Sequence, residues 1–129
     1  MPAIDADVLV RVLTGDDPDQ ARRARALVAA GPVFLPLTVC LEAEWVLRSG
    51  YGFPPDRIAA ALRAFAGLPT VQVEAPARLA LALDRMAAGM DFADALHLGA
   101  APPEAGFATF DRRMIRTAAR LGLTGVREP

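Results

Sequence analysis

The chain has 129 residues, of which 53% are hydrophobic and 22% are charged, and this composition fits one globular domain and excludes a disordered or fibrous protein. A single cysteine, Cys40, excludes a disulfide framework and a multi-cysteine zinc site. The net charge of −1 provides no overall positive field for a polyanion. All 14 basic residues are arginines, so any mechanism that needs a catalytic or phosphate-binding lysine is also excluded.

No membrane-spanning or targeting segment is expected. The longest uncharged stretch covers residues 26–41, which is shorter than the roughly 20 residues that cross a bilayer, and Gly31, Pro32 and Pro36 interrupt it. The first residues lack the basic region of a secretory signal. We therefore expect a cytoplasmic protein without a membrane partner.

Prolines, glycines and aspartates divide the chain into short apolar strands and longer helices. In chain order, we expect a strand at 2–4, helices at 8–13 and 19–30, a strand at 33–35, helices at 38–49 and 54–66, a strand at 71–73, helices at 75–88 and 91–100, a strand at 106–109, a helix at 111–121 and a last strand at 125–126. Short apolar strands that alternate with helices are typical of a parallel sheet covered on both faces. The predicted fold is therefore a single domain over residues 1–129, an α/β/α sandwich of three layers with a short, mostly parallel central sheet.

Several carboxylates do not fit a solvated surface, and the first is Asp5. Asp5 ends the first predicted strand, where aspartate is disfavoured. The carboxyl end of a central parallel strand is also where open α/β sheets bind their ligands. Asp7 lies two residues further on, and two interpretations of it remain open. It either lies on the same side as Asp5, or it caps the helix at 8–13, in which case Asp5 is only a turn residue.

Glu42 and Glu44 are separated by helix geometry, because residues two apart lie about 200° apart around the axis. Glu42 shares a stripe with Trp45 and its apolar neighbours, whereas Glu44 precedes Arg48 by four residues, the favoured order for a surface ion pair. We therefore expect Glu42 to point inward as a site residue and Glu44 to be a solvated pair partner. The same stripe places Trp45 in the core, and Thr38 is the expected cap of this helix.

Three further aspartates stand at predicted helix starts. Asp91 precedes Asp94 by three residues and is explained by capping, while the apolar neighbours of Asp94 indicate a mostly buried segment. Asp111 follows an apolar strand and precedes a helix, so both capping and a site role remain open for it. His97 lies one turn beyond Asp94 and could reach the site, but we expect it to be a packed helix residue.

Asp5, Glu42, Asp94 and Asp111 could converge at one edge of the sheet, and four carboxylates in contact would raise one another's pKa. No lysine can neutralise them, and no arginine lies inside these motifs. A divalent cation is the natural counter-charge, and ligation by oxygen alone selects Mg²⁺ or Mn²⁺. Such an ion activates water and neutralises a phosphodiester during hydrolysis.

Four segments together resemble the PIN-domain nucleases, and specifically toxins of the VapC type. These segments are Ile4-Asp5-Ala6-Asp7-Val8-Leu9-Val10-Arg11, Leu41-Glu42-Ala43-Glu44-Trp45-Val46-Leu47-Arg48, Asp91-Phe92-Ala93-Asp94-Ala95-Leu96 and Thr109-Phe110-Asp111. They occur in the order of the family, and the resemblance covers nearly the whole chain.

The resemblance implies a homodimer that cleaves RNA with Mg²⁺ or Mn²⁺ and is held inactive by a cognate antitoxin protein. It places Asp5, Glu42, Asp94 and Asp111 in the metal-binding, catalytic cluster. Asp7 and Asp91 would then be accessory, with Thr109 a polar neighbour; Asp7 departs from the family, which often carries asparagine there.

The substrate backbone would be held by arginines, which grip phosphate with two hydrogen bonds. Arg112, Arg113 and Arg116 follow Asp111 on the last predicted helix, and Arg11 lies one or two turns from Asp5. The same residues also fit a solvated helix face. Tyr51 and Phe53 fit either a base-stacking site or part of a partner groove.

Two other functions fit parts of the pattern. Residues 4–9 also resemble the opening motif of haloacid-dehalogenase-type phosphatases, with Asp5 as nucleophile and Asp7 as acid and base. That family uses a lysine that this chain lacks, and Glu42 would have no role. The second alternative is a PIN-like module that binds RNA or protein without cutting, although a pure binder has little reason to keep four mutually repelling carboxylates.

Overall fold

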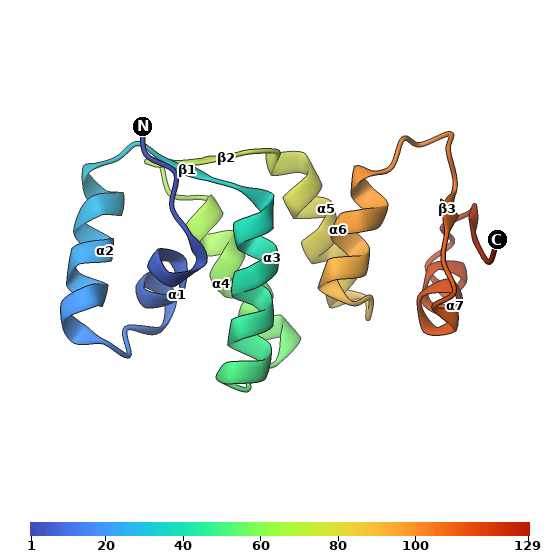
Figure 1. The fold of residues 1–129 in the computed structure, drawn as a ribbon, viewed down its shortest axis with the longest axis horizontal. Coiled ribbons are helices and arrows are strands. Elements are labelled where there is room, and N and C mark those ends of the chain that lie inside the picture. Colours follow the sequence, from blue (N-terminus) through green and yellow to red (C-terminus); the bar gives the residue numbers. More distant parts are fainter. The chain divides into compact units, whose positions relative to one another are not determined.

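A computed structural model describes all 129 residues, which form two compact units, Met1–Pro76 and Ala77–Pro129. The first unit contains an N-terminal extended segment, four α-helices and two strands (Figure 1). In chain order these are α1 (Ala6–Thr14), α2 (Pro18–Ala30), β1 (Val33–Leu35), α3 (Leu37–Trp45) with a π-helical turn η1 (Val46–Gly50), α4 (Pro55–Ala66) and β2 (Val71–Val73).

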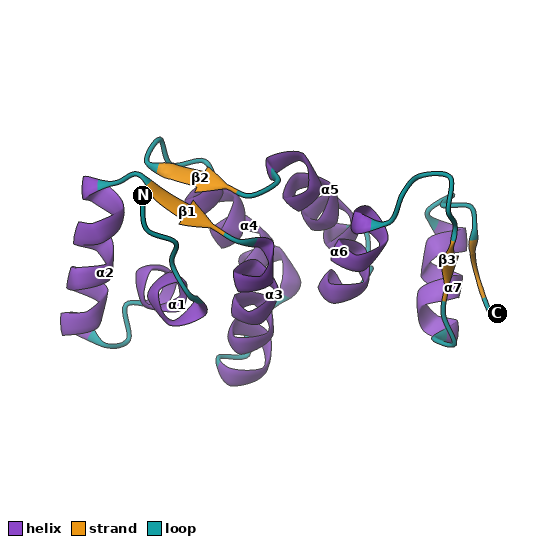
Figure 2. Ribbon diagram, turned by 45° about the horizontal axis from the view of Figure 1, so that its top comes forward, coloured by secondary structure: helices purple, strands orange, loops and turns teal.

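The strands of the first unit run parallel. β1 and β2 lie side by side (Figure 2), with Val33 opposite Val71 and Leu35 opposite Val73. Ala3 adds a parallel bridge to Phe34 on the other side of β1, where the Phe34 amide donates to the carbonyl of Pro2 at 2.8 Å. The expected first strand is reduced to this bridge, because α1 begins at Ala6 and Pro2 has no amide hydrogen to donate.

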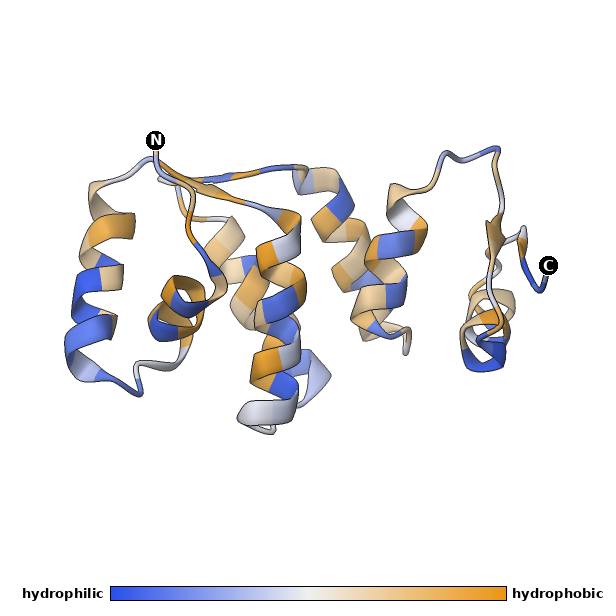
Figure 3. Cartoon of the chain, viewed as in Figure 1, coloured by the Kyte–Doolittle hydropathy of each residue, from blue (hydrophilic) through white to orange (hydrophobic).

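Side chains decide where these helices begin. The Asp5 carboxylate accepts a hydrogen bond from the Val8 amide at 2.9 Å, so Asp5 is the cap of α1, and of the two interpretations left open for Asp7 the capping one was wrong. α2 is capped in the same way by Asp17, and Figure 3 shows hydrophilic residues on its first turns. Thr38 does not cap α3; Pro36 precedes the helix, and Glu74 accepts from the Leu37 amide at 3.0 Å instead.

The core of the first unit lies where α1 packs against α2 and α3. Its fully buried side chains are aliphatic or small, as the apolar periodicity of these helices requires. They include Leu9, Leu35, Cys40, Leu47 and Ile58. Cys40 thus packs as a small apolar residue, and its burial lowers the reactivity of the thiol.

The second unit is built from three helices and two short parallel strands. It contains α5 (Pro76–Ala87), α6 (Phe92–Ala100), β3 (Phe107–Ala108), α7 (Arg112–Arg120) and β4 (Val126–Arg127). Phe107 pairs with Val126, and hydrogen bonds from the Phe107 amide to Gly125 and from the Thr109 amide to Arg127 close the ladder at 2.8 and 3.0 Å. The fold class, a mixed α/β fold with short parallel strands, is therefore confirmed.

One contact fastens α7 to the turn after α5. The Arg120 guanidinium donates to the carbonyl of Ala88 at 2.8 Å. Gly89 adopts φ of 106°, and a Cβ built there would lie 2.7 Å from Arg120 Nη2. The positive φ therefore favours glycine at this position, and any larger residue would also displace the Arg120 guanidinium.

No helix of the protein combines the length and the hydropathy needed to cross a bilayer. The prediction that residues 1–129 behave as one domain stays a prediction, to be tested by the cooperativity of unfolding.

The buried thiol should be unreactive in the folded protein. Burial, together with the charge of Glu74, raises the pKa of Cys40 to about 12, so very little thiolate exists at pH 8. We expect an aromatic disulfide reagent to modify the native Cys40 thiol roughly 1,000-fold more slowly than it modifies an exposed cysteine thiol at the same pH. Spectrophotometric titration in buffer and in denaturant measures both rates, and equal rates would contradict the burial of Cys40.

Candidate active site

In the first unit, the candidate acids lie on two helices. Asp5 is exposed at the start of α1, where its Oδ1 caps the helix and its second oxygen remains available for a ligand. Asp7 is also exposed, in the first turn of the same helix. Because Ala3 pairs with β1 in parallel, Asp5 and the start of α3 follow neighbouring carboxyl ends of one sheet.

The two glutamates of α3 are arranged oppositely to the expectation. Glu44 is 3% exposed, whereas Glu42 is exposed and Trp45 is 60% exposed. The expected inward direction of Glu42 and the core position of Trp45 were therefore wrong. The buried stripe of α3 runs through Cys40, Ala43 and Leu47, and Glu44 lies on it.

The expected ion pair does form, although at a buried position. Arg48 Nε donates to Glu44 Oε2 at 2.9 Å, which compensates the burial of this carboxylate. Glu44 is therefore a structural residue. Glu42 remains the candidate ligand of α3, since an exposed carboxylate can reach a ligand.

In the second unit, three aspartates stand at two helix starts. Asp91 caps α6 by accepting from the Asp94 amide at 3.1 Å, and Asp111 caps α7 by accepting from the Met114 amide at 3.1 Å. The Thr109 hydroxyl accepts from the Asp111 amide at 3.0 Å and so fixes the turn that presents this carboxylate. Each cap uses one carboxylate oxygen and leaves the other.

Asp94 is the electrostatic centre of this group. Desolvation raises its pKa, and the negative charges of Asp91 and Asp111 raise it further, while His97 and Arg113 act in the opposite direction. His97 is exposed on α6, so the expectation that it packs inside the protein was wrong. Desolvation and negative charge thus outweigh the positive charge near Asp94, and a pKa shifted in this way is a frequent property of functional carboxylates.

The donor set fits a divalent metal in its chemistry. Its members are carboxylates with uncommitted oxygens, and the unfavourable charge at Asp94 is what a cation would relieve. Within neither unit do three or more histidine, cysteine, aspartate or glutamate side chains lie close enough to hold a metal ion. Because Asp5 and Glu42 belong to one unit and Asp94 and Asp111 to the other, their convergence stays a prediction.

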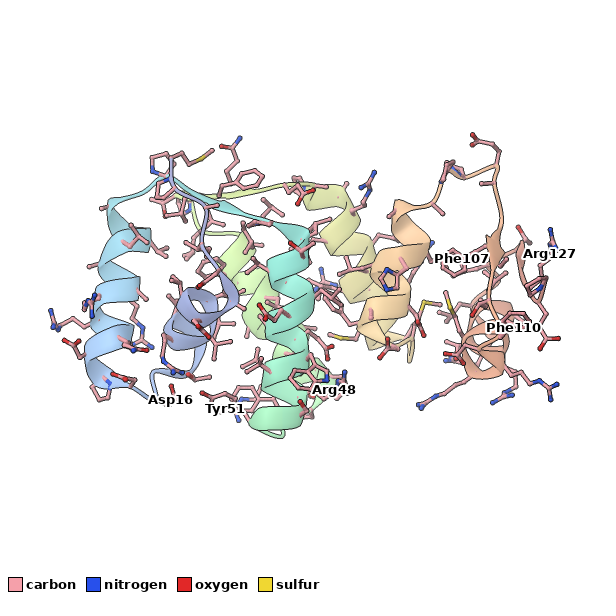
Figure 4. All side chains as sticks on the ribbon, viewed as in Figure 1. Asp16, Arg48, Tyr51, Phe107, Phe110 and Arg127 are labelled. Atoms are coloured by element: carbon pink, nitrogen blue, oxygen red, sulfur yellow. The ribbon has the colours of Figure 1, made fainter.

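Arg11 is held in a hydrogen-bonded cluster of the first unit. Its guanidinium contacts Gln20 at 2.7 Å, Asp16 at 3.0 Å and the Tyr51 hydroxyl at 3.4 Å. Tyr51 also donates to Asp16, which lies near it in Figure 4, and this hydrogen bond, against partial desolvation, lowers the pKa of Asp16. Arg11 therefore ties α1 to the residues before α2 and after η1.

The four arginines of α7 divide into two groups. Arg113 acts electrostatically on Asp94, and Arg120 binds the Ala88 carbonyl. Arg112 and Arg116, one turn apart, lie instead on the side of β4, with Glu128 at 3.5 Å from Arg112. Of the predicted arginines, Arg113 is therefore the one whose charge acts on a candidate carboxylate.

Two features escaped the sequence pattern. Glu74 helps to start α3 from 37 residues away, and Phe110, immediately before Asp111, is 79% exposed. Tyr51 and Phe53, for which a base-stacking site and a partner groove were both left open, contact each other with ring centroids 5.8 Å apart, and Arg57 lies over the Phe53 ring. The strand-like run around Phe110 gave no sign that this ring faces solvent.

The PIN domain family matches residues 3–120, and the chain belongs to this family. No curated protein matches the chain, and no solved structure matches it either. The predicted PIN family is therefore confirmed, and the α/β/α fold agrees with it. PIN domains are typically metal-dependent nucleases, so the family indicates a nuclease-type function in general, while the VapC-type subfamily stays a prediction.

The two glutamates of α3 should differ in their effect on stability. Glu44→Ala should lower the free energy of unfolding by about 2 kcal/mol, because it empties a buried site beside Arg48. Glu42→Ala should change it by less than about 0.5 kcal/mol, as is usual for an exposed side chain. Urea denaturation of both variants measures the difference, and a larger loss of unfolding free energy in Glu42→Ala than in Glu44→Ala would contradict the burial of Glu44.

Asp94 should reduce stability at neutral pH. Its raised pKa means that folding disfavours the ionised form, so this cost is present above the folded-state pKa and disappears as the pH falls below it. We expect Asp94→Asn to raise the Tm at pH 7 and to leave it nearly unchanged at pH 3. Thermal denaturation at both pH values checks this; a lower Tm for the variant at pH 7 would show that the charge is stabilising.

Proposed function

We propose that this protein is an endoribonuclease that hydrolyses RNA phosphodiester bonds at an acidic Mg²⁺ or Mn²⁺ site, and that it is the toxin of a type II toxin–antitoxin pair. The observation that carries the proposal is the set of aspartates around Asp94, whose like charges act on one another within a PIN domain. The absence of lysine leaves a cation as the simplest partner for these charges.

Asp5, Glu42, Asp94 and Asp111 are the proposed metal ligands, with Asp7 and Asp91 accessory. The metal would supply an activated water and neutralise charge on the phosphodiester. The chain itself holds the ligands in place: backbone amides fix Asp5, Asp91 and Asp111 at their helix starts. Arg113 adds a positive charge beside Asp94, where it would attract a substrate phosphate.

The proposed partners are a cognate antitoxin and a second copy of the chain. This part of the proposal is based on the resemblance of the four motifs to VapC-type toxins. Trp45 supports it, because an exposed tryptophan is typical of protein interfaces. Light scattering of the purified protein measures the homodimer, and growth arrest on expression without a partner measures toxicity.

The phosphatase alternative is weakened by the family match, since the PIN domain covers the segment around Asp5. Asp5 Oδ1 is also engaged by the Val8 amide. The non-cutting module is distinguished by experiment, because it would bind RNA and leave it intact with every metal.

RNA cleavage should require both a divalent metal and Asp94. We expect purified protein to cut a mixed RNA pool with Mg²⁺ or Mn²⁺ and not with EDTA. Asp94→Asn should reduce the rate by roughly 100-fold or more, the loss typical of removing one preorganised electrostatic contact. Denaturing gel electrophoresis of the RNA measures the rates.

The matched control is Asp56→Asn, which removes an exposed carboxylate from the first turn of α4, outside the candidate set. This variant should cleave at the rate of the unmodified protein. Intact RNA in every lane, after any bound antitoxin is removed under denaturing conditions and the protein refolded, would refute the proposed activity. Equal loss in both variants would refute the role of Asp94.

A further inference from the structure

A hollow of about 280 Å³ lies within the second unit, where the ends of α5 and α6 meet the start of β3 and the turn after α7. Four apolar side chains form much of its lining, and one of them, Phe107, is labelled in Figure 4: Leu98, Pro103, Phe107 and Leu123. Only two side chains with hydrogen-bonding groups line it, Arg85 and Thr124. The hollow thus combines an apolar lining with one guanidinium and one hydroxyl.

The burial of Arg85 is unusual for an arginine of this chain. Of the 14 arginines, Arg11 and Arg85 are half-buried, and the others are exposed. The Arg11 guanidinium is compensated by the Asp16 carboxylate and by two neutral partners. The Arg85 side chain, in contrast, has no ion pair or hydrogen bond within the chain. Since a charge that is partly removed from water is unfavourable without a partner, Arg85 is suited to an anion from another molecule.

The remaining lining defines the kind of anion. No carboxylate lines the hollow, so its one formal charge is the Arg85 guanidinium, which matches a ligand with a single negative charge. The apolar side chains match a hydrocarbon or aromatic body, whose removal from water is favourable. If each ligand atom takes about the 30 Å³ of a liquid water molecule, the hollow holds roughly nine non-hydrogen atoms.

We infer that this hollow binds a small organic monocarboxylate, a molecule with one carboxylate on a compact apolar body. The carboxylate binds the Arg85 guanidinium through two parallel hydrogen bonds, the favoured geometry of this pair. Thr124 offers a further donor in the same hollow, and the apolar body packs against residues such as Phe107 and Leu123. A benzoate ion has both parts at the required size.

Two other kinds of anion fit less well. A phosphate monoester carries close to two negative charges at neutral pH, whereas the hollow offers one guanidinium. An acidic side chain of another protein brings a carboxylate on a short linear chain, which leaves the apolar lining uncovered. A monocarboxylate with an apolar body uses the charge and the lining together.

The hollow is separate from the candidate acidic residues. It is lined by Gly106, which precedes β3, and by Thr124, which precedes β4, so it lies at the amino ends of these two parallel strands. Asp111 follows the carboxyl end of β3. Leu98 likewise lies near the end of α6, whereas Asp91 caps its start. A ligand in the hollow therefore leaves the candidate metal ligands free, and the inference does not depend on the proposed function.

The test measures binding of benzoate to the full chain in metal-free buffer. Two-dimensional NMR of the isotope-labelled protein follows the backbone amides and the Arg85 Nε–H group. We expect saturable shifts of Arg85 Nε–H and of the amides at 106–107 and 122–124, with a Kd of roughly 0.1 to 1 mM, as is ordinary for a ligand of this size. The amides of residues 91, 94 and 111 should not shift.

The charge of Arg85 and the apolar body of the ligand are tested separately. Arg85→Gln should weaken benzoate binding roughly 10- to 150-fold, because it removes a hydrogen-bonded ion pair. Acetate, which lacks the ring, and benzamide, which lacks the charge, should each bind the unmodified protein at least about 10-fold more weakly than benzoate. Arg78→Gln, which removes an exposed arginine of α5 outside the lining, is the matched control and should leave the Kd unchanged.

Arg85→Lys provides a second variant at the same position. Lysine keeps the positive charge and loses the two parallel hydrogen bonds, so its affinity for benzoate should lie between those of the unmodified protein and Arg85→Gln. Thermal denaturation without ligand checks that both variants fold.

Three results would overturn the inference: no saturable shift with benzoate, an unchanged Kd in Arg85→Gln, or an equal loss in Arg78→Gln. Phenyl phosphate that binds more tightly than benzoate would also overturn it and would assign the hollow to phosphate esters. N-acetylglutamate amide that binds as tightly as benzoate would overturn it in favour of an acidic protein segment. None of these measurements involves RNA or metal, so the failure of cleavage in the earlier assay has no bearing on them.

Discussion

Helix capping by aspartate is the interaction on which the candidate site depends. Asp5, Asp91 and Asp111 each accept a hydrogen bond from an amide three residues further along, and each thereby begins a helix. A carboxylate held in this way has little freedom, and the helix dipole favours its negative charge. The residues that start α1, α6 and α7 are thus also candidate ligands whose carboxylates the backbone holds in place.

Capping and ligand binding make different demands on the same group. A cap needs one carboxylate oxygen, whereas a ligand needs another that is free of the helix. Asp94 does not cap a helix. Its ionised form is disfavoured in the folded protein, since desolvation and the charges of Asp91 and Asp111 raise its pKa. The protein therefore tolerates unfavourable charge at one residue that two well-satisfied neighbours surround, which is typical of a site maintained for function.

Much of the secondary structure could be predicted because its signals are local. Pro54 and Pro55 indicate the start of α4, and Gly31 ends α2. The observed bounds of the helices differ from the expected ones by a residue or two. The positions of Asp5, Asp91 and Asp111 at helix starts could also be anticipated, since such aspartates are visible in the sequence, while the metal site that they would form stays a prediction. The buried face of α3 could not be predicted, because the large Trp45 outweighs the small Cys40 and Ala43 in any apolar pattern.

The remaining errors have long-range causes. Glu74, which follows β2, accepts from the first amide of α3, and Arg48 compensates Glu44 only once the helix has formed. The exposure of Phe110 depends on how β3 turns into α7, which no short pattern encodes. Sequence reasoning thus located the acids and misjudged side chains whose surroundings come from elsewhere in the chain.

The contact between Arg120 and the turn after α5 links two positions that are far apart in sequence. The guanidinium fills the space that a side chain at residue 89 would need, and it binds the carbonyl of residue 88. The same turn leads within two residues to Asp91. A side chain at residue 89 would push this guanidinium aside and would also strain the positive-φ backbone, so it would weaken the contact that holds the end of α7 to the turn before the α6 carboxylates.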